Sequence, residues 1–145
     1  MKILLLIMTI VISLYSAKID DFAKKANYER DYQSALIKAK KENKMLMLLV
    51  VADYCPWCKK FEKKILLNKS VSDMVQKNFI PVVIDKIKER GLYPDKYNTP
   101  LIPTVYFIDP SNENTLHNTV AYMTKKEYKK NMQQAIEMFD KKKKK

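Results

Sequence analysis

The sequence predicts a single α/β domain in which helices flank a central mixed sheet of four strands. The main observation is a continuous apolar run over residues 45–52, of the kind that forms a strand buried on both faces. Amphipathic helical patterns precede and follow this run, and three further segments have the composition of strands. The chain has 145 residues, which suits one domain with a substantial core rather than two.

In the first half of the chain, helical and strand patterns alternate. An amphipathic helix is predicted from the helical spacing of four apolar residues, Tyr28, Tyr32, Leu36 and Ala39. The buried strand at 45–52 follows, and after it Pro56 suits the first turn of a helix, where no amide hydrogen is needed. The segment "SVSD", residues 70–73, resembles a capping box and predicts the start of a further short helix.

The second half contains the other three predicted strands. Residues 79–85 form one of them, and Pro81 places it at an edge of the sheet because proline has no amide hydrogen to donate. Residues 86–101 lack a regular pattern. Strands at 103–109 and 115–123, joined by the turn "PSNEN", are predicted to form a hairpin.

The last predicted helix opens with a capping box, "TKKE", at residues 124–127. Its apolar stripe consists of Tyr128, Met132, Ala135 and Phe139. The chain ends in a run of lysines, residues 141–145, which we expect to form a solvated, frayed tail.

The chain is strongly basic, with 28 lysine and arginine residues against 16 aspartate and glutamate residues and a net charge of +12. Neither a nucleic-acid-binding motif nor interleaved arginine and aromatic residues accompany this charge. The sequence therefore argues against nucleic acid as a partner. Attraction to anionic lipid or to acidic partners is a better use of the charge.

The N-terminal segment, residues 1–17, predicts export from the cytosol. An early lysine precedes an apolar run that is short for a membrane span but suits a signal peptide, and small residues follow. Cleavage after Ala17 would leave the bulky Tyr15 at a position that prefers a small side chain, so an uncleaved N-terminal anchor is the alternative. Residues 18–140 form the predicted domain, and membrane contact is expected only through an uncleaved segment.

The motif "CPWC" contains the only two cysteines, Cys55 and Cys58, and three interpretations compete for it. A structural disulfide is a poor interpretation, because closing so short a loop stabilises little. A zinc site needs four ligands, and the single histidine, His117, lies far along the chain in a predicted strand. We therefore expect no metal ligands here and favour the third interpretation, a redox couple.

The redox interpretation draws on the position of the pair between a buried strand and a helix. Unpaired helix amides and the positive end of the helix dipole would point at the sulfur of Cys55. This environment favours the thiolate, which is the nucleophile of disulfide exchange. Cys58, one turn further on, would face the interior, from where it could attack the resulting mixed disulfide.

The segments around the cysteines resemble a known family. A strand, "YCPWCKK", a helix and a later "IPT" before a strand form the pattern of the thioredoxin fold. More closely, the chain is similar to the exported thioredoxin-related group that includes the C-terminal domain of DsbD-type thiol:disulfide interchange proteins. The segments "SALIKAKKENK", "WCKKFE" and "FIPVVID" carry this similarity, which extends over residues 30–139.

The resemblance implies roles for individual residues. Cys55 would be the attacking cysteine and Cys58 the resolving one. Pro103 would be a cis-proline beside them, with Ile102 presenting backbone groups to a substrate; a trans strand-start proline is the alternative. The substrate-binding set would be completed by Pro56, Trp57 and Thr104. Trp57 is interpreted either as an exposed recognition or packing residue next to the sulfur or simply as a partly buried aromatic residue.

The sequence departs from the family pattern in places. Cytosolic thioredoxins carry a buried acid six residues before the first cysteine, where this chain has Leu49. The lysine that usually accompanies that acid aligns roughly with Pro81, and Asp53 is only a weak substitute for the acid. Ala121 occupies a position where many relatives have glycine. These differences argue against a general cytosolic-type reductase and leave the direction of electron flow open.

The sequence thus predicts a periplasmic thiol–disulfide oxidoreductase that works without a metal or an organic cofactor. A reductase in an exported electron chain is the first choice, and an oxidase or isomerase of the same fold is the alternative. A non-catalytic peptide-binding or metal-carrying module is the competitor from another class. The expected partners are client proteins with disulfides or thiols and an upstream membrane electron-transfer protein.

Overall fold

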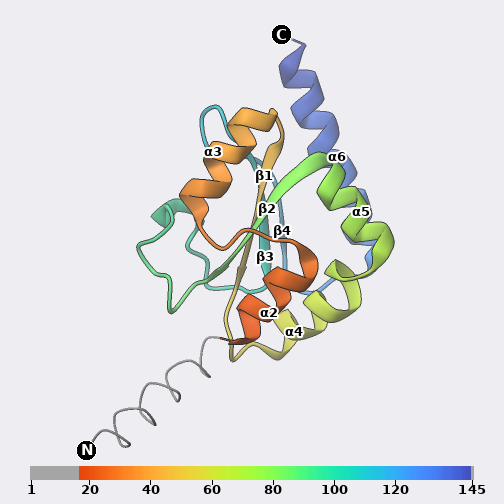
Figure 1. The fold of residues 1–145 in the computed structure, drawn as a ribbon. Helices are drawn as coiled ribbons and strands as arrows, with labels where there is room; N and C mark the ends of the chain where they lie inside the picture. The colour runs from red at the N-terminus through yellow and green to blue at the C-terminus, as the bar shows by residue number, and fades with distance from the viewer. Residues whose placement is uncertain (1–16, 145) are drawn as a thin grey trace, which may run out of the picture.

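The computed structural model describes residues 17–144, in which helices cover both faces of a four-stranded sheet (Figure 1). The strand order is β2–β1–β3–β4. The strands are β1 (Met45–Val51), β2 (Phe79–Asp85), β3 (Thr104–Asp109) and β4 (Asn114–Val120). Strand β1 pairs in parallel with β2 and antiparallel with β3, and β3 pairs antiparallel with β4. The predicted α/β class and mixed four-stranded sheet are confirmed.

The α-helices follow the predicted order with one addition at the start, and two short helical turns accompany them. They are α2 (Ala17–Ala26), α3 (Tyr32–Glu42), α4 (Pro56–Phe61), the π-helical turn η1 (Glu62–Leu66), α5 (Lys69–Asn78), the 3₁₀ turn η2 (Asp95–Tyr97) and α6 (Lys125–Lys143). Helix α2 was not predicted, although its buried residues Ile19, Phe22, Ala23 and Ala26 follow helical spacing.

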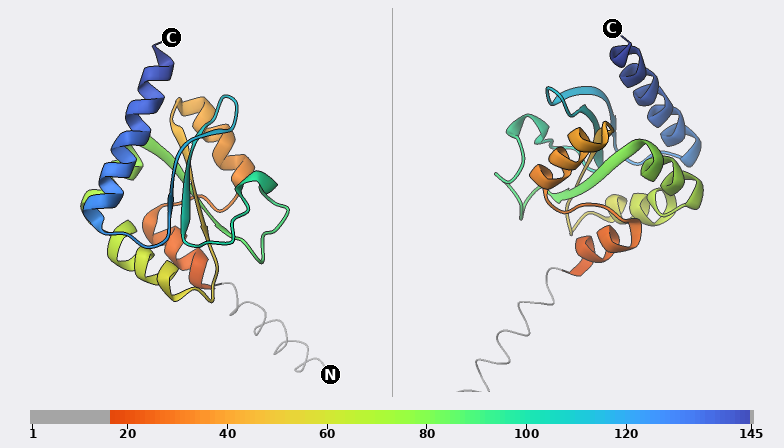
Figure 2. Two further views of the ribbon diagram at one scale, coloured as in Figure 1. Left: turned by 180° about the vertical axis from the view of Figure 1, so that it is seen from behind. Right: turned by 45° about the horizontal axis from the view of Figure 1, so that its top comes forward.

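Strand β1 is the centre of the molecule, and all seven of its residues are buried. Because side chains alternate along a strand, Met45, Met47 and Leu49 join one core layer with α2, α4, α5 and α6. Leu46 and Leu48 join the other layer, formed with α3. The views in Figure 2 show α3 and α6 on opposite sides of the sheet.

Pro81 lies in edge strand β2, as predicted. The segment before α3 partly covers this edge through Glu29. The amide of Glu29 donates to the carbonyl of Pro81 at 2.8 Å, and the carbonyl of Glu29 accepts from the amide of Val83 at 3.1 Å. The carbonyl of Pro81 and the amide of Val83 thus each find a hydrogen-bond partner outside the four-stranded sheet.

Several predicted helix boundaries shift because a different side chain caps the helix. Helix α3 begins at Tyr32 rather than at residue 28, since the Asp31 carboxylate accepts from the amide of Ser34 at 2.7 Å. Helix α5 is capped by Asn68, so the prediction of a capping box at 70–73 was wrong. The capping box predicted at the start of α6 is confirmed.

The C-terminal lysines differ from the frayed tail that we expected. Residues 141–143 continue α6, and two of these three lysines have partners on the domain. Lys142 forms an ion pair with Asp109. The Lys143 ammonium donates to the carbonyl of Asn43 at 2.9 Å and lies 4.2 Å from the ring centroid of Phe139.

The predicted export segment lies outside the described residues, apart from Ala17 at the start of α2. Within residues 17–144, none of the helices combines the length and the apolar composition needed to cross a bilayer.

Candidate redox site

Cys55 and Cys58 form a disulfide at the end of the sheet where β1 leads into α4. The amide of Cys55 donates to the carbonyl of Ala52 at 3.1 Å, which turns the chain sharply after the strand. Cys55 is the N-cap of α4, and Pro56 occupies the first helical position, as predicted. The sulfur of Cys55 accepts a hydrogen bond of 3.1 Å from the amide of Cys58.

The two cysteines differ in their access to solvent. Cys58 is completely buried, whereas Cys55 retains 6% of its accessible surface. A client sulfur can therefore approach the pair only from the side of Cys55. This asymmetry agrees with the expected outer position of Cys55 and inner position of Cys58.

The predicted proline loop lies at the same end of the sheet. Val50, near the end of β1, pairs with Thr104 at the start of β3, and the Ile102–Pro103 peptide bond before it is cis. Ile102 packs against the core cluster that contains both cysteines. The loop is held in place by the amide of Ala121, which donates to the carbonyl of Pro103 at 2.8 Å.

Two of the predicted substrate-binding residues, Pro103 and Thr104, are buried, and Thr104 turns its polar side chain inward. It is buried, and its hydroxyl donates to the carbonyl of Leu101 at 2.6 Å. The side chain therefore shapes the proline loop from within, and it presents no free hydroxyl to the surface.

The aromatic surface beside the disulfide centres on Trp57. This residue is 57% exposed. The rings of Trp57 and Tyr122 lie 5.7 Å apart, centroid to centroid. Tyr54 and Leu101 are also exposed apolar residues of this end of the domain. Such a surface is typical of peptide recognition.

Glu62 is a buried acid that sequence reasoning did not identify as part of the site. Its side chain forms an ion pair with Lys59 at 3.2 Å, and the residue is 5% exposed. Its amide donates to the carbonyl of Cys58, which places it one helical turn beyond the inner cysteine. Burial raises the pKa of the Glu62 carboxyl, and Lys59 only partly offsets this. The sequence signal was a glutamate at i+4 on the buried face of a cysteine helix.

Two neighbouring polar groups complete this environment. Burial raises the pKa of the Tyr28 hydroxyl, to which Tyr128 and Glu62 add, and among the described residues this hydroxyl has no hydrogen-bond partner. Asp53 pairs with Lys88. Leu49 is fully buried in an apolar layer, so the position of the usual family acid carries no charge here.

His117 is not near a set of metal ligands. Its ring lies on β4 and shares a hydrogen bond of 2.6 Å with the amide side chain of Asn131. Among residues 17–144, no three or more histidine, cysteine or acidic side chains are grouped to hold a metal ion.

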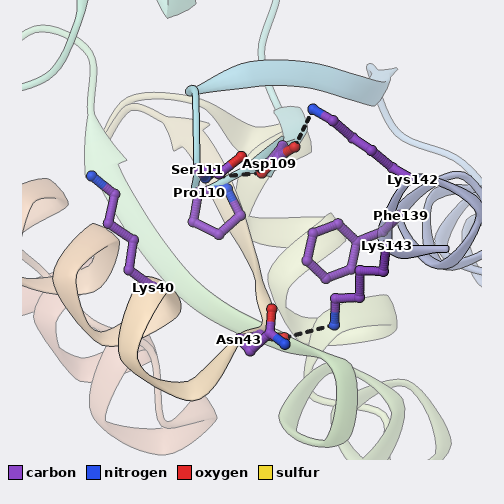
Figure 3. Close-up of a pocket in the computed structure, with 8 residues that line it drawn as sticks. All are labelled: Lys40, Asn43, Asp109, Pro110, Ser111, Phe139, Lys142 and Lys143. Carbon is purple, nitrogen blue, oxygen red and sulfur yellow. Dashed lines mark hydrogen bonds and ion pairs between the residues drawn. The ribbon is translucent and has the colours of Figure 1, made fainter. Parts of the chain in front are cut away.

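A second surface feature lies at the opposite end of the sheet, at the start of β1 and the end of β3. Figure 3 shows this cavity of about 380 Å³, which we call the lysine pocket. It is lined by Lys40, Asn43, Asp109, Pro110, Ser111, Phe139, Lys142 and Lys143. Because the cysteines follow the other end of β1, the lysine pocket is not part of the redox site.

A family model described as a thioredoxin-like domain matches residues 32–136. The chain belongs to this family. The match includes the cysteines, the proline loop and most of α6, and the thioredoxin-like fold that the resemblance implied is thereby confirmed. The matched region includes the C-x-x-C disulfide between Cys55 and Cys58.

Solved structures share the fold at low sequence identity. A thioredoxin from Thermus thermophilus superposes with a TM-score of 0.66 at 21% identity, covering 74% of this chain and 85% of that one. A DsbH oxidoreductase gives 0.63 at 20% identity, with 75% and 83% covered. The reduced DsbD C-terminal domain of Neisseria meningitidis gives 0.54 at 22% identity, with 71% and 92% covered.

Curated relatives match a shorter part of the chain. Anterior gradient protein 3 of Mus musculus is 30% identical over 81 residues, which cover 55% of this chain and 47% of that protein. Anterior gradient protein 2 homolog of Homo sapiens is 27% identical over 84 residues, covering 58% and 46%. The chain thus spans about half the length of these relatives.

Proposed function

We propose that this protein is an exported, periplasmic thiol–disulfide reductase that exchanges disulfides with client proteins through Cys55 and Cys58. The observation that carries the proposal is the unequal pair: an N-cap cysteine with residual access, linked to a fully buried partner one turn inward. A helix N-terminus favours the thiolate at Cys55, and the buried partner is protected from competing thiols.

The exchange proceeds in two balanced steps. In the reduced protein, the Cys55 thiolate attacks one sulfur of a client disulfide, which forms a mixed disulfide and expels one client thiolate. The Cys58 thiolate then attacks the Cys55 sulfur, which closes the protein disulfide and releases the second client thiolate. The expelled thiolates take up protons from solvent or from the Cys58 thiol, and two electrons pass to the client. Both steps involve only sulfur and protons, so no organic cofactor takes part.

The proline loop and the aromatic surface would hold the client during these steps. An extended client segment could pair with the backbone of Ile102, while Pro56 and Trp57 contact the side chains next to the reacting sulfur. Pro103 and Thr104 would keep the loop in position for this pairing.

The proposed direction of electron flow is toward the client, and the proposed location is the periplasm. The pattern of residues 1–17 supports export, and the likeness of the fold to the reduced DsbD domain suggests a membrane electron-transfer protein as the donor. That donor would return the disulfide to the dithiol after each client.

The test is the reduction of insulin disulfides by a small dithiol in the presence of the protein. We expect the protein to accelerate the reduction, Cys55→Ser to abolish the acceleration, and Cys58→Ser to accumulate mixed disulfides with insulin. A wild-type protein that gives no acceleration, or a Cys58→Ser variant that traps nothing, would contradict the exchange mechanism.

The direction is measured separately, as the reduction potential of the pair against glutathione. A reductase should lie nearer to about −270 mV, as in thioredoxin, than to about −120 mV, as in the oxidant DsbA. A value near the upper limit would replace the proposed reductase by an oxidase.

A further inference from the structure

We propose that Lys60, whose ammonium lies over the rings of both Trp57 and Tyr122, makes the redox site prefer client segments that carry an acidic side chain beside the reacting cysteine. This inference rests on the proposed exchange function and adds the class of client that the site selects.

The position of the Lys60 ammonium is unusually well defined for a surface lysine. Its nitrogen lies 4.9 Å from the ring centroid of Trp57 and 4.9 Å from that of Tyr122. A lysine ammonium on a flexible stem normally samples many positions. Two cation–π contacts restrict it to one, while its remaining N–H groups can still meet an acceptor.

The Lys60 ammonium contacts two segments of the chain, one on each side of the exposed face of the disulfide. Trp57 lies between the two cysteines in the sequence and opens α4. Tyr122 follows Ala121, whose amide binds the carbonyl of Pro103 in the proline loop. A client segment bound along that loop therefore passes Lys60 within a few residues of its own reacting cysteine.

The charges around Lys60 leave it available to a client. Within residues 17–144, no carboxylate lies within ion-pair distance of its ammonium, whereas the adjacent Lys59 is paired with Glu62. The other acid near the cysteines, Asp53, is paired with Lys88. The charge that this surface offers to a partner is consequently positive, and an acidic client side chain would supply the missing counter-charge.

We expect the contribution of a solvent-exposed ion pair between the Lys60 ammonium, which is already positioned, and a client carboxylate. Such a pair corresponds to a preference of about two- to fivefold for an acidic over a neutral client. Because opposite charges also accelerate encounter, the preference should appear in the second-order rate constant and shrink as salt is raised.

The experiment uses the reduced full-length protein and short disulfide-linked peptides that differ only at the residue after the cysteine, which is Glu, Gln or Lys. The single-turnover rate constant is measured at about 0.01 M and about 1 M salt. For the wild type we expect the order Glu, Gln, Lys at low salt and near equality at high salt. Lys60→Gln should remove the preference, and Lys60→Glu should reverse it.

The matched control is Lys64→Gln, which removes the same charge from an exposed lysine about one helical turn further along the chain, for which no ring contact is found among the described residues. It should keep most of the preference for Glu. Equal losses in Lys60→Gln and Lys64→Gln would assign the preference to net charge and overturn the role of Lys60. A wild type that reduces all three peptides equally would also overturn it, whereas a wild type that reduces none would instead refute the proposed exchange function.

Discussion

Each end of the sheet has a buried acid beside a lysine, yet the pKa values of the two acids are shifted in opposite directions. At the lysine pocket, burial raises the pKa of Asp109, but hydrogen bonds from Lys142 and Ser111 outweigh burial and hold it below its usual value. At the redox end, burial raises the pKa of Glu62, and Lys59 does not outweigh it. The ionised carboxylate is therefore favoured by its surroundings at the lysine pocket and disfavoured by them at the redox end.

The lysines show the same contrast. In the lysine pocket, Lys142 and Lys143 have partners in the domain, as the dashed lines in Figure 3 show. At the redox end, Lys60 contacts only aromatic rings among the described residues. The lysine side chains thus bind groups of the domain itself at one end, whereas at the other end the Lys60 ammonium remains accessible to a partner.

The largest change in stability is expected from Lys142→Met. This variant leaves the buried Asp109 without its ion-pair partner, although Ser111 still donates to it, so the free energy of unfolding should fall by about 1–2 kcal/mol. The loss should be present above pH 4 and vanish in more acid solution, where Asp109 is protonated in both variants. Urea unfolding at pH 7 and at successively lower pH values, down to below the lowered pKa of Asp109, measures it.

The control for this prediction is Lys141→Met, an exposed lysine of the same helix, which should change stability little. The rate of disulfide exchange should be the same in both variants and in the wild type. A lower exchange rate in Lys142→Met would show that the two ends are coupled and would break the comparison.

The sequence was sufficient to predict the strands and the cysteine site. Strand β1 is recognisable because a continuous apolar run of seven or eight residues has few alternatives, and Pro81 marks the edge strand because of a missing donor. The outer and inner positions of the two cysteines follow from the strand-to-helix turn. These features are local, so a single sequence contains them.

Other features depend on partners far along the chain, and the sequence did not reveal them. Residues 141–143 looked like a solvated tail because Asp109 and Asn43, which bind them, lie 30 or more residues away. Helix α2 was overlooked because most of its apolar residues are alanines and every other residue of the helix is charged. The contact of Lys60 with Tyr122 likewise joins two segments that only the fold brings together.

A smaller effect is expected from Ala121→Gly, which tests where the backbone is strained. Each end has a residue with positive φ: Asn43 with 53° at the lysine pocket and Ala121 with 66° beside Pro103. Asparagine adopts this conformation readily, whereas alanine adopts it only at an energetic cost. Ala121→Gly should therefore raise the free energy of unfolding by up to about 1 kcal/mol.

The matched variant is Ala39→Gly, in the regular part of α3, which should lower the free energy of unfolding by about 1 kcal/mol or more. Thermal unfolding of the two variants gives opposite shifts if the strain lies at Ala121. Two downward shifts would mean that the positive φ costs little, and the redox end would then be no more strained than the lysine pocket.

The smallest expected change comes from Glu62→Gln, and it appears as a pH dependence. Because the pKa of Glu62 is raised in the folded protein, the folded state keeps a proton that the unfolded state has already lost just above the usual value of 4.5. Wild-type stability should therefore fall as the pH rises through this window, whereas Glu62→Gln, which never ionises, should lack this fall. Unfolding free energies at closely spaced pH values between 4 and 8 give the difference.

The control is Glu137→Gln, at an exposed acid on α6, whose stability should change with pH in parallel with that of the wild type. If the stability of Glu62→Gln also changed with pH in parallel with that of the wild type, the charge of Glu62 would be as well stabilised by its surroundings as that of Asp109. The contrast between the two buried acids would then disappear.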